Sequence, residues 1–132
     1  MNPSAPGPQK KTIMLVEDNK ALRDAFREIL EAAGYEVLSA ANGREALALY
    51  HEKNLEVNLL VSDINMPEMS GIELAVILRQ ANPNIKVVIM SGLAPSGAVQ
   101  QNYPVPIESW LQKPIGMKIF LQTINDLMRG EP

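Results

Sequence analysis

The sequence predicts an α/β domain in which a doubly wound parallel sheet carries helices on both faces. From Thr12 onward, short apolar segments alternate with segments of helical periodicity, as is typical of parallel strands joined by helices. The apolar segments are nearly uniform in character, as in Ile-Met-Leu-Val at residues 13–16, which indicates strands covered on both faces. Because 132 residues are the size of one ordinary domain, we expect a single domain over residues 12–129.

Five strands are expected in this unit, and all are short. The fifth has the least regular pattern. Their predicted positions are residues 12–16, 35–40, 58–62, 85–90 and 109–112. In an open parallel sheet the ligand lies beyond the carboxyl ends of the strands, where the strand order reverses, so the residues that follow the strands are the first candidates for function.

The helices between the strands carry recognisable end signals. Asn19 can cap the first helix, and Gly34 suits the left-handed conformation that often ends one. Asn42-Gly43 opens a second helix, and the third begins with the capping-box spacing Ser70-x-x-Glu73. The last helix reaches about residue 129.

The segment over residues 93–107 differs from the others. It contains Pro95, Gly97, Pro104 and Pro106, and prolines remove backbone donors while glycine disfavours helix. We therefore expect the fourth helix to be short or irregular, with at most a short helix over residues 96–102.

Composition narrows the functional classes. Hydrophobic residues make up 46% and charged residues 20%, the net charge is −3, and cysteine is absent. These values predict a globular chain without disulfides or thiolate metal sites, and no concentrated basic face suggests nucleic-acid binding. No apolar run approaches the length of about 20 residues that a membrane span needs. Residues 1–11 are expected to form a flexible tail or linker, and residues 130–132 a short tail.

Polar residues that suit phosphoryl chemistry follow four of the five predicted strands. Glu17 and Asp18 follow the first strand, Asp63 the third, Ser91 the fourth and Lys113 the fifth. Carboxylate oxygens bind Mg²⁺, a carboxylate can attack phosphorus, and a hydroxyl and an ammonium can hold phosphoryl oxygens. Each residue alone is more simply a helix cap, a turn residue or a surface lysine. Caps have no reason to converge at one sheet edge, so the set predicts a site.

These residues resemble response-regulator receiver domains, the phosphoacceptor modules of two-component signalling, over residues 12–129. The resemblance rests on four motifs in order: Val16-Glu17-Asp18-Asn19, Asp63-x-x-Met66-Pro67-x-x-x-Gly71, Met90-Ser91-Gly92 and Lys113-Pro114. The last two motifs, taken with Trp110, are most similar to receivers attached to hybrid histidine kinases.

The resemblance implies a flavodoxin-like fold with strand order 2-1-3-4-5 and a role for each matching residue. Asp63 is the implied phosphoacceptor. The implied Mg²⁺ ligands are Asp18 directly, Glu17 through an intervening water, one oxygen of Asp63 and the backbone carbonyl of Asn65. Lys113 supplies a fixed positive charge, Ser91 and Trp110 form the switch, and Pro114 follows a cis peptide bond.

The function implied is to accept a phosphoryl group from a histidine kinase or a histidine phosphotransfer protein and to change conformation toward an unknown target. The only expected chemistry is the Mg²⁺-dependent phosphorylation and dephosphorylation of Asp63, in a monomer in the cytoplasm. One alternative is a phosphorylation-independent interaction module of the same fold. A metal-dependent phosphatase fits less well, because such enzymes carry a second acid two residues after the first aspartate and Asp18 is followed there by Lys20.

Overall fold

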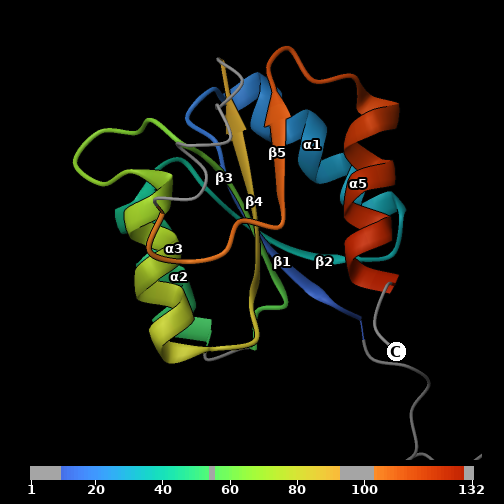
Figure 1. Cartoon of the computed structure of the whole chain (residues 1–132). Helices are drawn as coiled ribbons and strands as arrows, with labels where there is room; N and C mark the ends of the chain where they lie inside the picture. Colours follow the sequence, from blue (N-terminus) through green and yellow to red (C-terminus); the bar gives the residue numbers. More distant parts are fainter. Residues whose placement is uncertain (1–9, 54–55, 93–102, 130–132) are drawn as a thin grey trace, which may run out of the picture.

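The computed structural model describes residues 10–53, 56–92 and 103–129, which form five strands and four helices (Figure 1). In chain order these are β1 (Thr12–Val16), α1 (Lys20–Ala32), β2 (Glu36–Ala40), α2 (Gly43–Lys53), β3 (Leu59–Asp63), α3 (Gly71–Ala81), β4 (Lys86–Ser91), β5 (Ser109–Gln112) and α5 (Met117–Arg129). All five predicted strands are present, and each boundary lies within one residue of its predicted position.

The strands form one parallel sheet in the order β2-β1-β3-β4-β5, which confirms the predicted topology. The chain moves outward from β1 to β2 and then returns to the other side of β1 to form β3. The strand order therefore reverses between β1 and β3, where open α/β sheets bind their ligands. The register places Val16 beside Ser62 and Asp63 beside Met90, so these strands end at nearly the same level.

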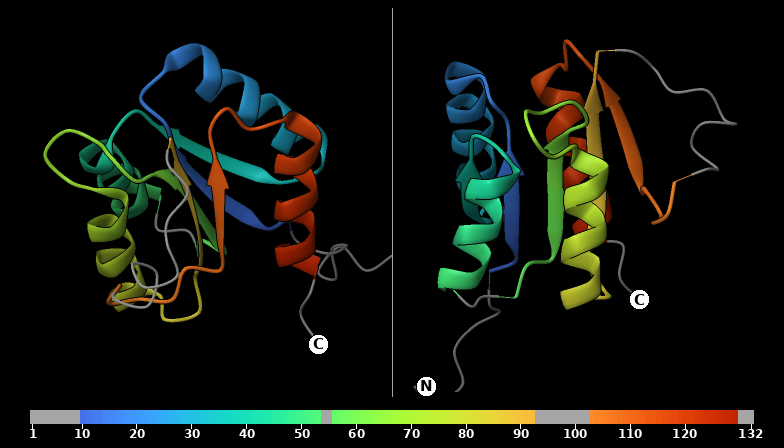
Figure 2. Two further views of the ribbon diagram at one scale, coloured as in Figure 1. Left: turned by 45° about the horizontal axis from the view of Figure 1, so that its top comes forward. Right: turned by 90° about the vertical axis from the view of Figure 1, so that its left-hand side faces the viewer.

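Two hydrophobic layers hold the helices to the sheet. α1 and α5 cover one face, and α2 and α3 cover the other (Figures 1 and 2). The buried strand residues alternate between the layers: Ile13 and Leu15 belong to the first, and Met14 and Val16 to the second. In the first layer the rings of Phe26 and Phe120 stack with centroids 4.2 Å apart and join α1 to α5.

The predicted helix ends are confirmed. The side-chain oxygen of Asn19 accepts a hydrogen bond from the Leu22 amide at 3.0 Å, which caps α1. After α1, Gly34 adopts φ of 101°, a conformation that residues with a Cβ rarely adopt. Ser70 and Glu73 each accept a hydrogen bond from the other's backbone amide and complete a capping box on α3.

The expected short fourth helix falls on residues 93–102, which lie outside the described residues. The following stretch, residues 103–107, is not helical, as its prolines predict. Within the described residues, no helix has the length and apolar character needed to cross a membrane.

Candidate functional site

The carboxyl ends of β1, β3 and β4 and the residues after β5 surround a hollow of about 120 Å³, which we term the acidic cleft. Its lining consists of Asp18, Asp63, Ile64, Asn65, Met90, Ser91, Gly92 and Lys113. These include five of the residues predicted for the site. Glu17 is fully buried and reaches the same group through Lys113.

Lys113 joins two carboxylates from different strands. Its Nζ lies 2.6 Å from Oδ1 of Asp63 and 2.9 Å from Oε1 of Glu17. The first contact is an ion pair and not a well-directed hydrogen bond, since Oδ1 of Asp63 is buried without a hydrogen-bond partner of good geometry. The backbone also fixes Lys113, because its amide donates to the carbonyl of Ser91 at 2.7 Å. The ammonium is thus aimed at Asp63.

Burial and the contacts between Asp63, Lys113 and Glu17 together shift the pKa values of Asp63 and Lys113. Burial raises the pKa of Asp63 to about 6; the Lys113 ammonium lowers it and the neighbouring Glu17 carboxylate raises it. Burial alone would lower the pKa of Lys113, but its bonds to Asp63 and Glu17 prevail, and the pKa lies above its ordinary value. Lys113 is therefore charged at neutral pH, and Asp63 is ionised above about pH 6.

The acidic cleft has the composition of a divalent-cation site. Glu17, Asp18 and Asp63 each offer a carboxylate oxygen, and these oxygens lie within 4.8 Å of one another. An all-oxygen set of this kind suits Mg²⁺. Asp18 is exposed, and Asp63 has a second carboxylate oxygen beside the one that pairs with Lys113, so both residues have capacity for an ion. The residues present fit a bound cation.

Gly71 allows α3 to start directly against Asp63. A Cβ at this position would lie 2.2 Å from the carbonyl oxygen of Asp63, far inside van der Waals contact. The Gly71 amide donates to the carbonyl of Ile64 at 2.9 Å, and the Ser62 hydroxyl donates to the carbonyl of Asp63 at 2.9 Å. Gly71 was visible in the sequence only as part of a motif, and the close approach explains why a glycine is needed there.

The remaining predicted residues lie around the cleft. Ser91 ends β4 and lines the cleft, together with Asn65. Trp110 lies on β5, half-buried, with its ring 5.2 Å from that of Tyr103. The bond between Lys113 and Pro114 is cis, as the resemblance implied. The proposed ligand role of the Asn65 carbonyl and the switch roles of Ser91 and Trp110 stay predictions.

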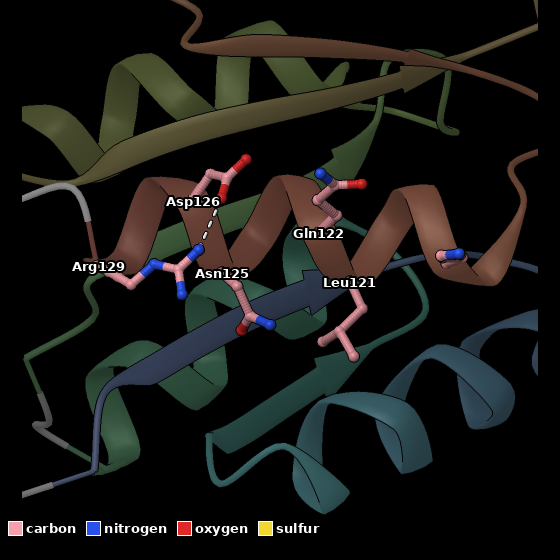
Figure 3. A pocket seen from close by; sticks show the side chains of 6 residues that line it. Leu121, Gln122, Asn125, Asp126 and Arg129 are labelled. Carbon is pink, nitrogen blue, oxygen red and sulfur yellow. Dashed lines mark hydrogen bonds and ion pairs between the residues drawn. The ribbon is translucent and has the colours of Figure 1, made fainter.

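Other features of the described residues offer no comparable chemistry. A hollow of about 390 Å³ lies along α5, where Arg129 pairs with Asp126 at 3.0 Å (Figure 3). Its side chains bring no group of acids or nucleophiles together. His51 is exposed near the end of α2 beside Tyr50, as expected of a surface histidine.

Two residues next to the site were not singled out in the sequence. Arg23 donates a hydrogen bond from Nη1 to the backbone carbonyl of Glu17 at 2.7 Å, and Tyr103 packs against Trp110. The position of Arg23, one turn into α1 after the Glu17-Asp18 pair, was a usable signal for the first contact. The second depends on the path of the chain before β5, which the periodicity did not indicate.

The parallel sheet and its acidic cleft define a flavodoxin-like α/β domain with a group of three carboxylates at its switch point. A family model described as the response regulator receiver domain matches residues 13–125. The chain therefore belongs to the receiver-domain family of two-component signalling.

Individual relatives agree with this assignment. The chain is 38% identical over 121 residues to the sensor kinase CckA of Brucella abortus, an alignment covering 91% of the chain and 13% of the kinase. It is 33% identical over 120 residues to the polar-differentiation response regulator DivK of Brucella anthropi, covering 89% of the chain and 96% of DivK. The chain thus spans a small part of the kinase and nearly all of the regulator. Because both kinds of relative match, the finer assignment to hybrid-kinase receivers stays a prediction.

Solved structures show the same fold. The chemotaxis response regulator CheY4 of Vibrio cholerae superposes with a TM-score of 0.79 at 28% identity, covering 90% of this chain and 99% of that one. The receiver domain from the hybrid histidine kinase CckA superposes with a TM-score of 0.74 at 32% identity, covering 89% and 98% respectively.

Proposed function

We propose that this receiver domain accepts a phosphoryl group on Asp63 from a partner phosphohistidine, with Mg²⁺ bound in the acidic cleft. The observation that carries the proposal is the placement of Asp63. Its carboxylate lies 2.6 Å from the Lys113 ammonium and within 4.8 Å of carboxylate oxygens of Glu17 and Asp18. A nucleophile, a fixed cation and a cation-binding set therefore meet at one point.

In the proposed transfer, an oxygen of the Asp63 carboxylate attacks phosphorus and the bond from phosphorus to the histidine nitrogen breaks. The products are an acyl phosphate on Asp63 and an imidazole, which leaves with the bonding electrons. Asp63 must be ionised to attack, and with its pKa raised to about 6 it is ionised at neutral pH. Lys113 balances charge on the phosphoryl oxygens, and Ser91, which lines the same cleft, donates its hydroxyl to one of them.

Bound Mg²⁺ supplies charge neutralisation, the main requirement of phosphoryl transfer. Asp18 and Asp63 are the residues that would hold it. Both oxygens of Glu17 are already engaged, by Lys113 at 2.9 Å and by the Asn19 amide at 3.1 Å. This arrangement supports the expectation that Glu17 acts on the ion indirectly.

The cleft also indicates the kind of donor. Pockets for small-molecule substrates usually measure about 300–1,000 Å³, and the acidic cleft measures about 120 Å³. A cleft of this size admits only the phosphoryl end of a donor, which is compatible with a phosphohistidine of a histidine kinase or a phosphotransfer protein and also with acetyl phosphate. We infer that the only chemistry is on Asp63 itself, with no separate substrate turned over. A cytoplasmic location and a monomeric state remain expectations from the family.

Intact-mass measurement after incubation with acetyl phosphate and Mg²⁺ tests the proposal. We expect a gain of about 80 Da, the mass of one added phosphoryl group, in the wild-type chain. Asp63→Asn should abolish it. Asp126→Asn is the matched control, because Asp126 is a surface acid paired with Arg129 on α5, and it should leave the gain unchanged.

Three outcomes would contradict the proposal. An undiminished gain in Asp63→Asn would place the acceptor elsewhere. No gain in the wild-type chain would favour an interaction module that works without phosphorylation. Repeated hydrolysis of acetyl phosphate without any adduct would favour a phosphatase.

A further inference from the structure

Arg23 connects α1 to the end of β1 through one short hydrogen bond. Its Nη1 lies 2.7 Å from the backbone carbonyl oxygen of Glu17. The pairing of β1 with β3 ends at Val16, so this carbonyl lies beyond the ladder. Glu17 is fully buried, and a buried carbonyl needs a partner. Arg23 provides one that carries a charge, which makes the bond stronger than one between neutral groups.

The hydrogen bond from Arg23 is one of four that hold Glu17 in place. Its amide donates to the Ala40 carbonyl at 3.0 Å. Its two carboxylate oxygens accept from Lys113 at 2.9 Å and from the Asn19 amide at 3.1 Å. With Arg23 on the carbonyl, every polar group of Glu17 has a partner. Neither its backbone nor its side chain can turn without breaking a bond.

Asp18 lies between two residues that are anchored in this way. On one side Glu17 is held as described, and on the other Asn19 is held by the Glu17 carboxylate and by its own cap to Leu22. Asp18 itself is exposed, so the backbone on either side fixes the position of its Cβ and thereby limits the directions that its carboxylate can take. Arg23 therefore acts on Asp18 through Glu17.

We propose that Arg23 is a positioning residue for cation binding in the acidic cleft. It holds the turn between β1 and α1 in the shape that directs Asp18 toward Asp63. This inference rests on the proposed function, because it concerns the cation that supports phosphorylation. A competing explanation is that Arg23 only holds α1 against the sheet and contributes to stability without affecting cation binding.

Mg²⁺ binding in the absence of any phosphoryl donor separates these explanations. Isothermal titration calorimetry on the full chain would compare the wild type with Arg23→Met, which keeps much of the apolar stem and loses the donors. Arg27→Met is the matched control, since Arg27 lies one turn further along α1 and forms an exposed ion pair with Glu31. Arg23→Lys tests rescue by a residue that keeps the charge and one donor group.

We expect Arg23→Met to weaken Mg²⁺ binding about 10-fold, as changes to residues that orient metal ligands commonly do. Arg27→Met should stay within about twofold of the wild type, because exposed ion pairs contribute little. Arg23→Lys should recover part of the affinity. If Arg23→Met does not fold, weaker binding by Arg23→Lys than by Arg27→Met still supports the proposal, and equal binding overturns it.

A folded Arg23→Met variant could instead bind Mg²⁺ with the affinity of the wild type and melt at a lower temperature. That result would show that Arg23 contributes to stability alone. Failure of the proposed function has a different signature: the wild-type chain would bind Mg²⁺ and the Arg23 variants would bind it more weakly, yet acetyl phosphate would give no adduct on Asp63.

Discussion

Asp63 is held as a buried carboxylate in surroundings that disfavour its charge. Its pKa is raised from 3.8 to about 6, chiefly by burial, with Lys113 opposing and Glu17 adding to the effect. A carboxyl group whose pKa is higher in the folded chain binds its proton more tightly there. The folded state is therefore favoured by acid at this residue, in contrast to the usual effect of salt-bridged acids.

The sign of this effect gives a prediction for stability without Mg²⁺. Between about pH 4 and pH 6 the unfolded chain has lost the Asp63 proton while the folded chain still holds it. The free energy of unfolding therefore falls as pH rises through this window. One pKa unit corresponds to about 1.4 kcal/mol, so the full contribution is about 3 kcal/mol. Asp63→Asn should remove it and make the chain more stable than the wild type at pH 7.5. Urea unfolding of both chains at several pH values would measure the difference.

The two urea curves must diverge with pH for this explanation to hold. If the wild type and Asp63→Asn differ by a constant amount from pH 4 to pH 7.5, the burial of Asp63 does not control its ionisation.

Gly71 is the residue whose size sets the distance between α3 and the phosphoacceptor. A methyl group there would overlap the Asp63 carbonyl, 2.2 Å away, and this backbone cannot give way as a flexible side chain can. Gly71→Ala should destabilise the chain by about 1–3 kcal/mol and slow the phosphorylation of Asp63 by displacing it. Thermal unfolding and the rate of adduct formation would measure the two effects.

Gly116→Ala is the control for this prediction. Gly116 is exposed before α5, and a Cβ there would meet nothing within 4 Å, so the change should be close to neutral. A neutral Gly71→Ala would mean that α3 shifts freely relative to β3.

Among the elements, β5 and the stretch before it are joined by side chains that the sequence pattern does not indicate. The Tyr103 and Trp110 rings lie 5.2 Å apart, and Arg79 of α3 reaches the carbonyl of Pro106 at 3.5 Å. These contacts tie residues 103–107 to the face of the sheet that α2 and α3 cover. Trp110 therefore has a neighbour that limits its movement.

Tyr103→Leu should release part of this constraint. Aromatic pairs of this kind contribute about 0.5–1.5 kcal/mol beyond burial, and the leucine cannot cover the indole as the tyrosine ring does. Because Trp110 is the only tryptophan, its emission reports on this position directly, and it should shift to longer wavelength. Tyr50→Leu, on α2 beside His51, should leave the emission unchanged. Identical spectra for the wild type and Tyr103→Leu would show that Tyr103 does not shield Trp110.

The elements themselves could be predicted from the sequence because their signals are local. Nearly uniform apolar runs mark buried parallel strands, and Asn19, Gly34 and Ser70 mark helix ends through bonds to residues only a few positions away. Convergence of the acids and Lys113 followed from topology. The bonds made by Arg23 and Tyr103 could not be predicted in the same way, because they depend on how a helix or a connecting segment packs on the sheet.

At the scale of the whole molecule, an excess of negative charge lies at one edge of the sheet. Three carboxylates lie within 4.8 Å of one another, and one ammonium, that of Lys113, pairs with two of them. Three negative charges against one positive charge leave an excess of two. A divalent cation would balance this excess, so binding of the ion should be coupled to the stability of the entire fold.

This coupling gives the last prediction. A ligand that binds only the folded chain stabilises it by about 1.4 kcal/mol when its concentration is 10 times its Kd, which corresponds to a rise in Tm of about 3–6 °C for a chain of this length. Asp18→Ala should remove most of the rise, because Asp18 is the exposed acid of the group, whereas Asp126→Ala on α5 should retain it. Thermal unfolding with and without Mg²⁺, at constant ionic strength, would measure the shift. An equal shift in the wild type and Asp18→Ala would place the ion outside the acidic cleft, since the constant ionic strength excludes general screening by salt as the cause.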